Sequence, residues 1–433
     1  MLHDPFRREG PIVTSLADDD FYKLSMLSFL LSDRELLAQA RTRFSFKNRT
    51  AQILLSNFIA KQDLQRELEH VASLRFTETE LRYLSGHFVS EETPEGEVSR
   101  RMFSARFPDE LRALRLSPIY ATHEACGAFD IAAIGSWAEA TLWEIHVLQI
   151  VAQLYFEALI RPLSVFQRQA VWAEGVQRLQ EKIAILRKHP DITITDFGTR
   201  RRACGAWQRY VNTVLLEELG PGQYRGTSNI LLSMENHTVP MGTFAHELVM
   251  GMSGIMHATD DGIVASQNML FDQWYEHFGN PLSIALSDTY GTDFFLRTFG
   301  AERAAQWRGT RQDSGDPFLY GERLIAFYRS VGVDPTSKLI IFSDGLDVST
   351  IVQLAERFRG RIRVTFGWGT NLTNDFGEKF HPLSLVMKLA VCNGQRTVKL
   401  SDNLAKAMGS PEDVDHFAHI FGHAGTFTQQ TRY

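Results

Sequence analysis

The sequence predicts an α/β protein: a TIM-like α/β barrel with an additional α+β domain built from the N- and C-terminal segments. The pattern changes near residue 140, from mixed helix and strand signals to a repeated order of strand, loop and helix. Such alternation implies parallel strands with right-handed crossovers, in an open sheet or a closed barrel. Polar, glycine-bearing loops follow nearly every strand of the second part, and this favours a barrel whose strand-end loops surround one site.

Residues 1–140 are expected to form the α+β domain. Apolar periodicity and alternation predict helices at 21–32, 51–72 and 78–88 and strands at 41–47, 120–123 and 128–134. Residues from about 395 to 433 are expected to complete this domain. Asn393-Gly394 is a typical hairpin turn between strands at 385–391 and 397–401.

Residues 141–394 are expected to form the barrel. Residues 142–160 are apolar on nearly all sides, as in a buried helix, and a second helix has apolar residues at spacings of three and four from Trp172 to Leu186. Residues 347–358 form a further predicted helix, with Gly360 as its C-cap. Strands are predicted at 192–196, 223–226, 282–287, 339–343 and 361–366.

The composition excludes several classes of function. The 433 residues are 44% hydrophobic and 22% charged with a net charge of -6, so no basic excess indicates nucleic acid. No uncharged apolar run reaches the ~18 residues of a spanning helix, and the N-terminus lacks the apolar core of a signal peptide. A cytoplasmic protein without a membrane partner is therefore expected. Cys126, Cys204 and Cys392 lack metal-ligand spacing and are expected to be buried free thiols.

Five polar clusters follow predicted strands. Each alone is compatible with ordinary turn chemistry. Together they supply glycines for close backbone approach, carboxylates for a metal or ribose hydroxyls, and guanidinium groups for anionic oxygens. The clusters are DFGTRRR at 196–202, GTSN at 226–229, RQDSGDP at 311–317, FSDG at 342–345 and FGWGTN at 366–371.

Residues within these clusters have alternative interpretations. Gly367, Gly369 and Thr370 follow a late strand, where barrels commonly bind phosphate, but they are also compatible with a tight turn. The three consecutive arginines at 200–202 require anionic partners or splayed side chains. Arg311 lies beside Asp313 in the sequence and is equally compatible with a structural ion pair.

His246 is the candidate nucleophile or proton carrier. An adjacent carboxylate and small neighbours in GTFAHE, residues 242–247, would leave its ring accessible, although a histidine in the core or on the surface is the alternative. No zinc-helix spacing surrounds it, and no protein-held metal is expected. Tyr22 stands in DDDFYKL, residues 18–24, between charges of both signs. A helix N-terminus with capping aspartates is the alternative there.

Taken in order, these motifs resemble those of the nicotinate phosphoribosyltransferase family. The resemblance runs from about residue 12 to about residue 405 and includes DFYK at 20–23 and KLSD at 399–402. It implies an irregular barrel of the type II phosphoribosyltransferases and a homodimer with shared active sites. The implied activity, in NAD salvage, forms nicotinate mononucleotide and pyrophosphate from nicotinate and phosphoribosyl pyrophosphate. ATP hydrolysis through a phosphohistidine would be coupled to it, with Mg²⁺ entering on the substrates.

The resemblance also implies roles for single residues. His246 would be phosphorylated by ATP, with Arg311, Asp313 and Asp288 as further catalytic residues. Tyr22 from the partner subunit and Phe197 would sandwich the pyridine ring. The other residues expected to bind substrate are Arg200, Thr227, Ser228, Ser314, Gly315, Asp344, Gly345, Gly367, Gly369 and Thr370.

Four other functions remain open at this stage: nicotinamide phosphoribosyltransferase, the quinolinate enzyme, a non-catalytic relative that binds pyridines and phosphates, and a barrel lyase that acts on another sugar phosphate. Ser228 bears on the first, because the amide-using relatives carry an aspartate after Gly-Thr. A carboxylate there can accept a hydrogen bond from an amide, whereas a serine beside arginines suits a carboxylate substrate. The sequence therefore favours the acid.

Overall fold

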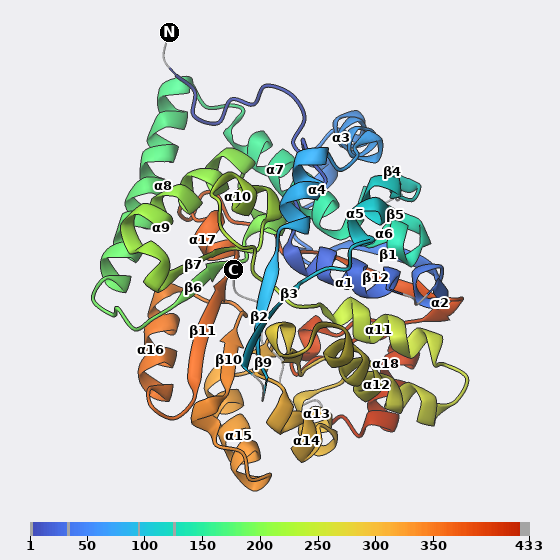
Figure 1. Cartoon of the computed structure of the whole chain (residues 1–433). Coiled ribbons are helices and arrows are strands. Elements are labelled where there is room, and N and C mark those ends of the chain that lie inside the picture. Colours follow the sequence, from blue (N-terminus) through green and yellow to red (C-terminus); the bar gives the residue numbers. More distant parts are fainter. Residues whose placement is uncertain (1–2, 33–34, 94–95, 124–126, 425–433) are drawn as a thin grey trace.

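The computed structural model describes residues 3–32, 35–93, 96–123 and 127–424. These residues form a five-stranded antiparallel sheet, a six-stranded parallel sheet and a two-stranded hairpin. The antiparallel sheet lies at the upper right of Figure 1, and the parallel sheet lies at the lower left. Cys204 and Cys392 are buried free thiols as predicted, while Cys126 lies outside the described residues.

The antiparallel sheet joins both ends of the chain. Its strand order is β13-β12-β1-β5-β4, and Phe44 of β1 lies opposite Leu389 of β12. The strands are β1 (Arg41–Asn48), β4 (Ile119–His123), β5 (Phe129–Ser136), β12 (Leu385–Cys392) and β13 (Gln395–Arg396). Asn393 and Gly394, both at positive φ, form the predicted turn between β12 and β13. The strand expected over 397–401 is wrong, because β13 ends at Arg396 and Lys399 forms an isolated bridge with Met408 instead of extending the sheet. After the parallel sheet, the chain thus returns to this antiparallel sheet at residue 385. The domain boundaries at 140 and 394 stay predictions.

Helices cover this sheet and connect it to the parallel one. Helix α7 is buried on all sides from residue 143 to residue 156, as its apolar sequence predicted. The helices of this part are α1 (Phe21–Leu31), α2 (Glu35–Ala38), α3 (Lys61–Ser73), α4 (Glu78–Ser85), α5 (Phe107–Ala113), α6 (Trp137–Ala140) and α7 (Trp143–Ile160), with the 3-10 turn η1 (Leu55–Asn57).

The parallel sheet has the strand order β7-β6-β11-β10-β9-β8. This order is cyclic, as in a barrel, because the first strand, β6, pairs with the last, β11. Within the described residues no pairing joins β7 to β8, so the parallel sheet is shown and a closed TIM-like barrel is not. The strands are β6 (Ile194–Asp196), β7 (Tyr224–Thr227), β8 (Ile284–Leu286), β9 (Gly309–Gln312), β10 (Leu339–Phe342) and β11 (Arg363–Trp368).

Helices alternate with these strands and lie around the parallel sheet (Figure 1). Asp347 caps α16 by accepting a hydrogen bond from the backbone N–H of Thr350, and this helix buries one apolar face. The helices are α8 (Val165–Leu186), α9 (Gly205–Gln223), α10 (Ile230–Glu235), α11 (His246–Ile255), α12 (Asp260–Phe278), α13 (Thr292–Thr298), α14 (Gly300–Gln306), α15 (Pro317–Ser330), α16 (Val348–Phe358), α17 (Thr370–Thr373) and α18 (Pro411–Phe421), with 3-10 turns η2 (Thr199–Arg201), η3 (Asn280–Leu282), η4 (Pro335–Ser337) and η5 (Leu404–Lys406).

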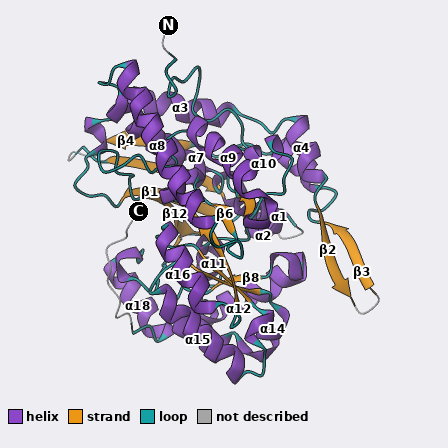
Figure 2. Ribbon diagram, turned by 90° about the vertical axis from the view of Figure 1, so that its left-hand side faces the viewer, coloured by secondary structure: helices purple, strands orange, loops and turns teal. Residues whose placement is uncertain are grey.

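Two predictions in the N-terminal part are wrong. The helix expected over 51–72 begins only at Lys61, because the Asn48 side chain binds the backbone of Thr50 and Ile53 and holds a turn there. The helix expected over 78–88 ends at Ser85. Beyond it, an unpredicted hairpin of β2 (Phe88–Thr93) and β3 (Gly96–Arg101) projects from the body in Figure 2.

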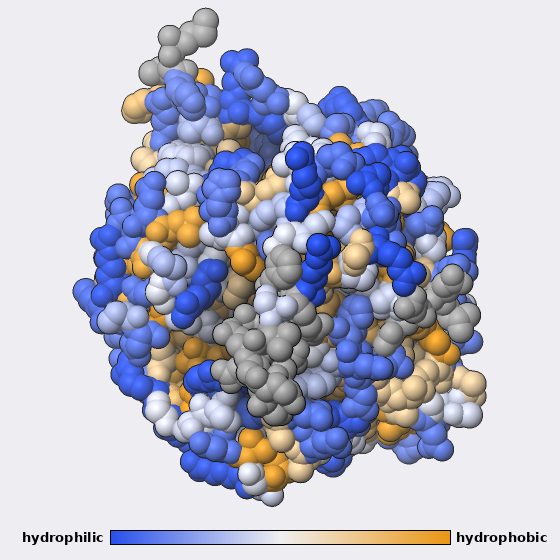
Figure 3. Space-filling model, in the orientation of Figure 1, coloured by the Kyte–Doolittle hydropathy of each residue, from blue (hydrophilic) through white to orange (hydrophobic). Residues whose placement is uncertain are grey.

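The core contains many buried aromatic side chains, including Trp207, Trp274 and Trp368. Hydrophilic residues predominate on the face drawn in Figure 3, with smaller hydrophobic areas between them. None of the helices in the described part of the chain has both the length and the apolar character needed to cross a membrane.

Candidate active site

A cavity of about 400 Å³ lies at the carboxyl ends of the parallel strands. The loops after β6, β9, β10 and β11 form one wall, as expected where parallel strands end together. Tyr22 of α1 and Lys388 of β12 reach it from the antiparallel side, and Lys399 and Lys406 from the C-terminal segment. A second cavity of about 690 Å³ near Phe6 contains none of the predicted site residues.

The structure brings most of the predicted site residues together. Those that line the cavity are Tyr22, Phe197, Arg200, Ser228, His246, Arg311, Asp313, Gly315, Asp344, Gly345, Gly367, Gly369 and Thr370. Thr227, Asp288 and Ser314 do not line it. Thr227 donates to Asp196 over 2.8 Å, and Ser314 donates to Asp288 over 2.5 Å, so these residues support the wall.

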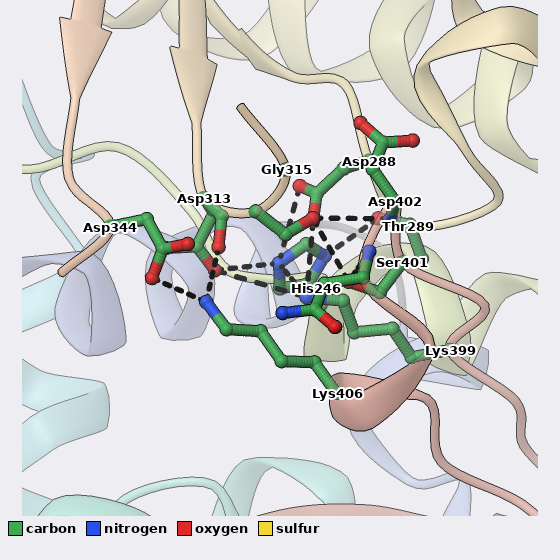
Figure 4. A network of polar contacts seen from close by, with 12 residues as sticks. His246, Asp288, Thr289, Asp313, Gly315, Asp344, Lys399, Ser401, Asp402 and Lys406 are labelled. Carbon is green, nitrogen blue, oxygen red and sulfur yellow. Dashed lines mark hydrogen bonds and ion pairs between the residues drawn. The ribbon is translucent and has the colours of Figure 1, made fainter. Parts of the chain in front are cut away.

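His246 is the first residue of α11 and is buried at the centre of a polar network (Figure 4). Its Nδ1 lies 2.9 Å from Oγ1 of Thr289. Its Nε2 lies 2.9 Å from Oδ2 of Asp313 and 2.8 Å from Nζ of Lys399. Burial and then the charge of Lys399 lower the pKa of His246 to about 4, against the opposing effect of Asp288 and Asp313. The imidazole is therefore neutral near pH 7 and keeps a lone pair for a nucleophilic role.

Two carboxylates stay ionised beside His246. Burial alone would raise the pKa of Asp313, but the hydrogen bond with His246 and the charges of Arg311 and Lys399 hold it well below its usual range. Lys399 likewise outweighs burial and lowers the pKa of Asp288, whose Oδ2 lies 3.3 Å from Nζ.

His246, Asp288 and Asp313 offer ligand atoms within 4.8 Å of one another, a grouping that can hold a metal ion. In this structure the Lys399 ammonium supplies the positive charge among them. The absence of a metal held by the protein alone stays a prediction.

Tyr22 and Phe197 lie in one cavity within a single chain. The backbone N–H of Phe21 donates to the carbonyl of Ser228 over 2.7 Å, and Asp20 forms a β-bridge with Asn229. These bonds hold the start of α1 against the loop after β7. The chain's own Tyr22 therefore lines this cavity, and the contribution of Tyr22 from a partner subunit stays a prediction.

The three consecutive arginines diverge, which is one of the two predicted outcomes. Arg201 donates to the carbonyl of Leu385, and Arg202 binds both carboxylate oxygens of Asp18 at 2.8 and 2.6 Å. Arg200 alone of the three extends toward Glu144, with Nη1 4.0 Å from Oε1, and stays partly exposed to the cavity. It is thus available to an anionic ligand.

Ser228 does not have the free hydroxyl that its sequence position suggested. Its Oγ donates to Oδ1 of Asp20 over 2.6 Å. Burial raises the pKa of Asp20 to about 6, against the hydrogen bonds that it accepts. The carboxyl group that faces this part of the cavity is therefore supplied by Asp20.

Three glycines line the cavity and shape its wall in different ways. Gly345 has φ 57°, a left-handed conformation that suits glycine. A Cβ at Gly367 would lie 2.2 Å from the ring of Phe197, so this glycine makes room for the aromatic side chain. At Gly369 a Cβ would meet only ordinary contacts, and its backbone, at φ -100° and ψ -115°, turns the chain into α17.

Comparison with known proteins decides the family. Residues 192–424 match the family model described as "Nicotinate phosphoribosyltransferase (NAPRTase) family", and residues 17–152 match its N-terminal domain. The chain belongs to the nicotinate phosphoribosyltransferase family. The recognition from the sequence motifs is thereby confirmed.

Solved structures of this family share the whole architecture. The nicotinate phosphoribosyltransferase of Porphyromonas gingivalis is 29% identical, with a TM-score of 0.82, over 95% of this chain and 100% of its own. That of Vibrio cholerae is 30% identical, with a TM-score of 0.82, over 97% of this chain and 96% of its own. The chain is thus similar to nicotinate phosphoribosyltransferases over almost its full length.

Sequence reasoning assigned no role to several residues of this site. Lys399 lay in a recognised motif, but only the fold places it at His246. Lys406 forms an ion pair with Asp344 and donates to the carbonyl of Asp313 over 2.9 Å. Nothing in the local sequence of Lys406 or Lys388 distinguishes them from surface lysines.

Proposed function

We propose that this protein transfers a phosphoribosyl group from phosphoribosyl pyrophosphate to the ring nitrogen of nicotinate, with ATP hydrolysis coupled through a phosphohistidine at His246. The observation that carries the proposal is the composition of one cavity, which is lined by the neutral His246, the ionised Asp313 and two aromatic residues, Tyr22 and Phe197. Membership of the nicotinate phosphoribosyltransferase family supports the choice of substrate.

The transfer itself needs little proton movement. The C1–O bond to pyrophosphate breaks and its electron pair leaves with pyrophosphate, while the pyridine nitrogen lone pair forms the new bond to C1. The transition state has oxocarbenium character, so positioning and neutralisation of the leaving group are the main requirements. Tyr22 and Phe197 would hold the ring, Arg311 would neutralise the leaving group, and Asp313 and Asp344 would face ribose hydroxyls and Mg²⁺ that enters with pyrophosphate.

The coupling step uses the lone pair of His246. The attack requires the tautomer in which the single ring proton is on Nδ1 and is donated to Thr289, so that Nε2 no longer donates to Asp313. Nε2 then attacks the γ-phosphorus of ATP, and the P–O bond to ADP breaks. The Lys399 ammonium, 2.8 Å from Nε2, would pair with the phosphoryl oxygens. Water later cleaves the P–N bond, and the difference in substrate affinity between the two forms drives the transfer forward.

We propose the finer features of the resemblance on the same basis. The cyclic strand order supports an irregular barrel that is open between β7 and β8. A homodimer, a cytoplasmic location and the ligase or glycosyltransferase type of reaction follow from the family alone. Gel filtration with light scattering tests the homodimer.

An assay of nicotinate mononucleotide formation tests the central proposal. Purified protein receives phosphoribosyl pyrophosphate, Mg²⁺ and either nicotinate or nicotinamide, with and without ATP. Product from nicotinate, increased by ATP, is expected. If product forms from nicotinamide but not from nicotinate, the amide-using alternative is supported, since the Asp20 carboxyl can accept a hydrogen bond from an amide. If no product forms from either substrate, a non-catalytic binding protein is supported.

The phosphate site is proposed at the loop that contains Gly369 and Thr370. Gly369→Val is expected to raise the KM for phosphoribosyl pyrophosphate about tenfold or more, because the branched side chain would stand where a phosphate approaches the backbone of this loop. Gly367→Ala is the matched control: its Cβ meets Phe197, so it should raise the KM for nicotinate instead. Steady-state kinetics distinguish the two, and an unchanged phosphoribosyl pyrophosphate KM in Gly369→Val excludes this phosphate site.

A further inference from the structure

A group of buried charges lies next to Tyr22, one of the aromatic residues that line the cavity. Glu144 on α7, which is 1% exposed, is shared by three cations from distant segments. Its Oε1 accepts a hydrogen bond from Nζ of Lys388 over 2.9 Å, and its Oε2 lies 2.8 Å from Nζ of Lys23. Nη1 of Arg200 lies 4.0 Å from Oε1. One carboxylate thus organises cations from α1, β12 and the loop after β6.

Lys388 differs from Lys23 in what it faces. Lys23 is fully buried and also pairs with Glu247, whereas Lys388 lines the cavity. An ammonium group has three donors, and within the described residues Lys388 donates a hydrogen bond only to Glu144. Donor capacity is therefore left toward the cavity, beside Arg200.

This group of charges lies beside Tyr22, one of the two aromatic residues proposed to hold the pyridine ring. Nζ of Lys23 lies 5.6 Å from the ring centre of Tyr22, and Glu144 and Arg200 both act on the Tyr22 hydroxyl. Lys406, another lysine that lines the cavity, is paired instead with Asp344 in the loop after β10. A ligand stacked on Tyr22 would therefore present its substituent to Arg200 and Lys388.

We propose that Lys388 is a second cation for the carboxylate of the substrate, acting beside Arg200, and that Glu144 positions both. This inference rests on the proposed function and names a residue that sets the preference for an acid over an amide. A carboxylate has two oxygens and can accept from both cations at once, whereas an amide would leave one cation facing an NH₂ group. Lys388 thus contributes to selection against the amide as well as to affinity for the acid.

The pH dependence of nicotinate binding follows from the same arrangement. Burial lowers the pKa of Lys388 to about 8, with Glu144 opposing and Arg200 and Lys23 adding to the shift. Burial raises the pKa of Asp20 to about 6 and also raises the pKa of Tyr22. The ion pairs of this group outweigh burial for the others: they raise the pKa values of Lys23 and Arg200 and lower that of Glu144. Loss of the Lys388 proton removes a cation, so the nicotinate KM should change little between about pH 7 and 7.5, above the titration of Asp20, and should rise above pH 8, about tenfold by pH 9.

Steady-state kinetics of Lys388→Met test the proposal. The nicotinate KM should rise at least about tenfold, while kcat and the phosphoribosyl pyrophosphate KM stay within about twofold. Lys388→Arg, which keeps the charge, should recover most of the loss. Lys338→Met is the control, because Lys338 is also buried but donates to the carbonyls of Ala305 and Trp307 before β10, outside the cavity.

The possible outcomes separate this inference from the proposed function. If the wild-type protein makes nicotinate mononucleotide but Lys388→Met keeps its nicotinate KM and its preference over nicotinamide, the role of Lys388 is excluded and the function stands. If the wild-type protein makes no product, the function itself fails. Should Lys388→Met not fold, the wild-type pH profile decides, since a nicotinate KM that stays flat from pH 7 to 9.5 overturns the proposal.

Discussion

His246→Ala is expected to reduce ATP hydrolysis by about 10³-fold or more and to abolish formation of an acid-labile phosphoprotein. The reason is the loss of Nε2, which faces Asp313 and Lys399 and which the proposed coupling requires as nucleophile. Some transfer without ATP should remain, because Tyr22, Phe197 and Arg311 do not depend on the imidazole for their positions. Labelling with [γ-³²P]ATP, together with product assays in the presence and absence of ATP, measures both effects.

Two further variants show whether the effect belongs to the imidazole. Thr289→Ala removes the partner of Nδ1 and should slow phosphorylation by about tenfold without abolishing it, because the ring loses its orientation but keeps Nε2. His416→Ala, an exposed histidine that pairs with Asp260, should change nothing. ATP hydrolysis in step with product formation in His246→Ala would mean that the nucleophile is another residue.

The parallel sheet could be predicted because its strands alternate with helices along the chain. The order of strand, loop and helix from residue 192 onward determines the direction of each strand. Barrel closure could not be predicted in this way. Closure depends on hydrogen bonds between the backbones of β7 and β8, and the chain between them forms α10, α11 and α12 without a strand. The side-chain patterns of the separate segments do not indicate whether the two edge strands of the sheet form hydrogen bonds with each other.

The candidate site was largely predictable for a related reason. Residues such as Asp313, Asp344 and Thr370 follow strands, and the carboxyl ends of parallel strands converge at one edge. Lys388 and Glu144 could not be found in this way. They lie within regular elements, a strand and a buried helix, and meet only because β12 pairs with β1 and α7 packs beneath it.

The hydroxyl of Ser228 illustrates a limit of reasoning from single positions. Residue type predicted a donor for the substrate, but the β-bridge between Asp20 and Asn229 directs that donor to Asp20 instead. Asp20 stands more than two hundred positions earlier in the chain, so no local pattern connects the two. The same bridge explains why Tyr22 reaches the cavity from within its own chain.

Ser228→Asp is expected to lower kcat/KM for nicotinate by about 100-fold or more, with no gain for nicotinamide. Oγ of Ser228 lies 2.6 Å from Oδ1 of Asp20, so the new carboxylate would contact an existing one. Two like charges at 4 Å cost ~4 kcal/mol at an effective dielectric constant of 20. The pKa of Asp20, already raised to about 6, would rise further, and every pair that stays unprotonated at neutral pH carries two negative charges in place of the single charge of the wild type. The added negative charge would repel a carboxylate substrate.

Steady-state kinetics with both substrates measure this effect, and a double variant identifies its cause. Asp20→Asn combined with Ser228→Asp leaves one carboxylate and restores a hydrogen bond between the two positions, so nicotinate turnover should recover by about tenfold or more over Ser228→Asp alone. Ser228→Asn, neutral and of similar size, should lose much less than Ser228→Asp. If Ser228→Asp keeps full nicotinate turnover, position 228 has no part in the choice of substrate. If the double variant recovers nothing, repulsion from Asp20 is not the cause of the loss.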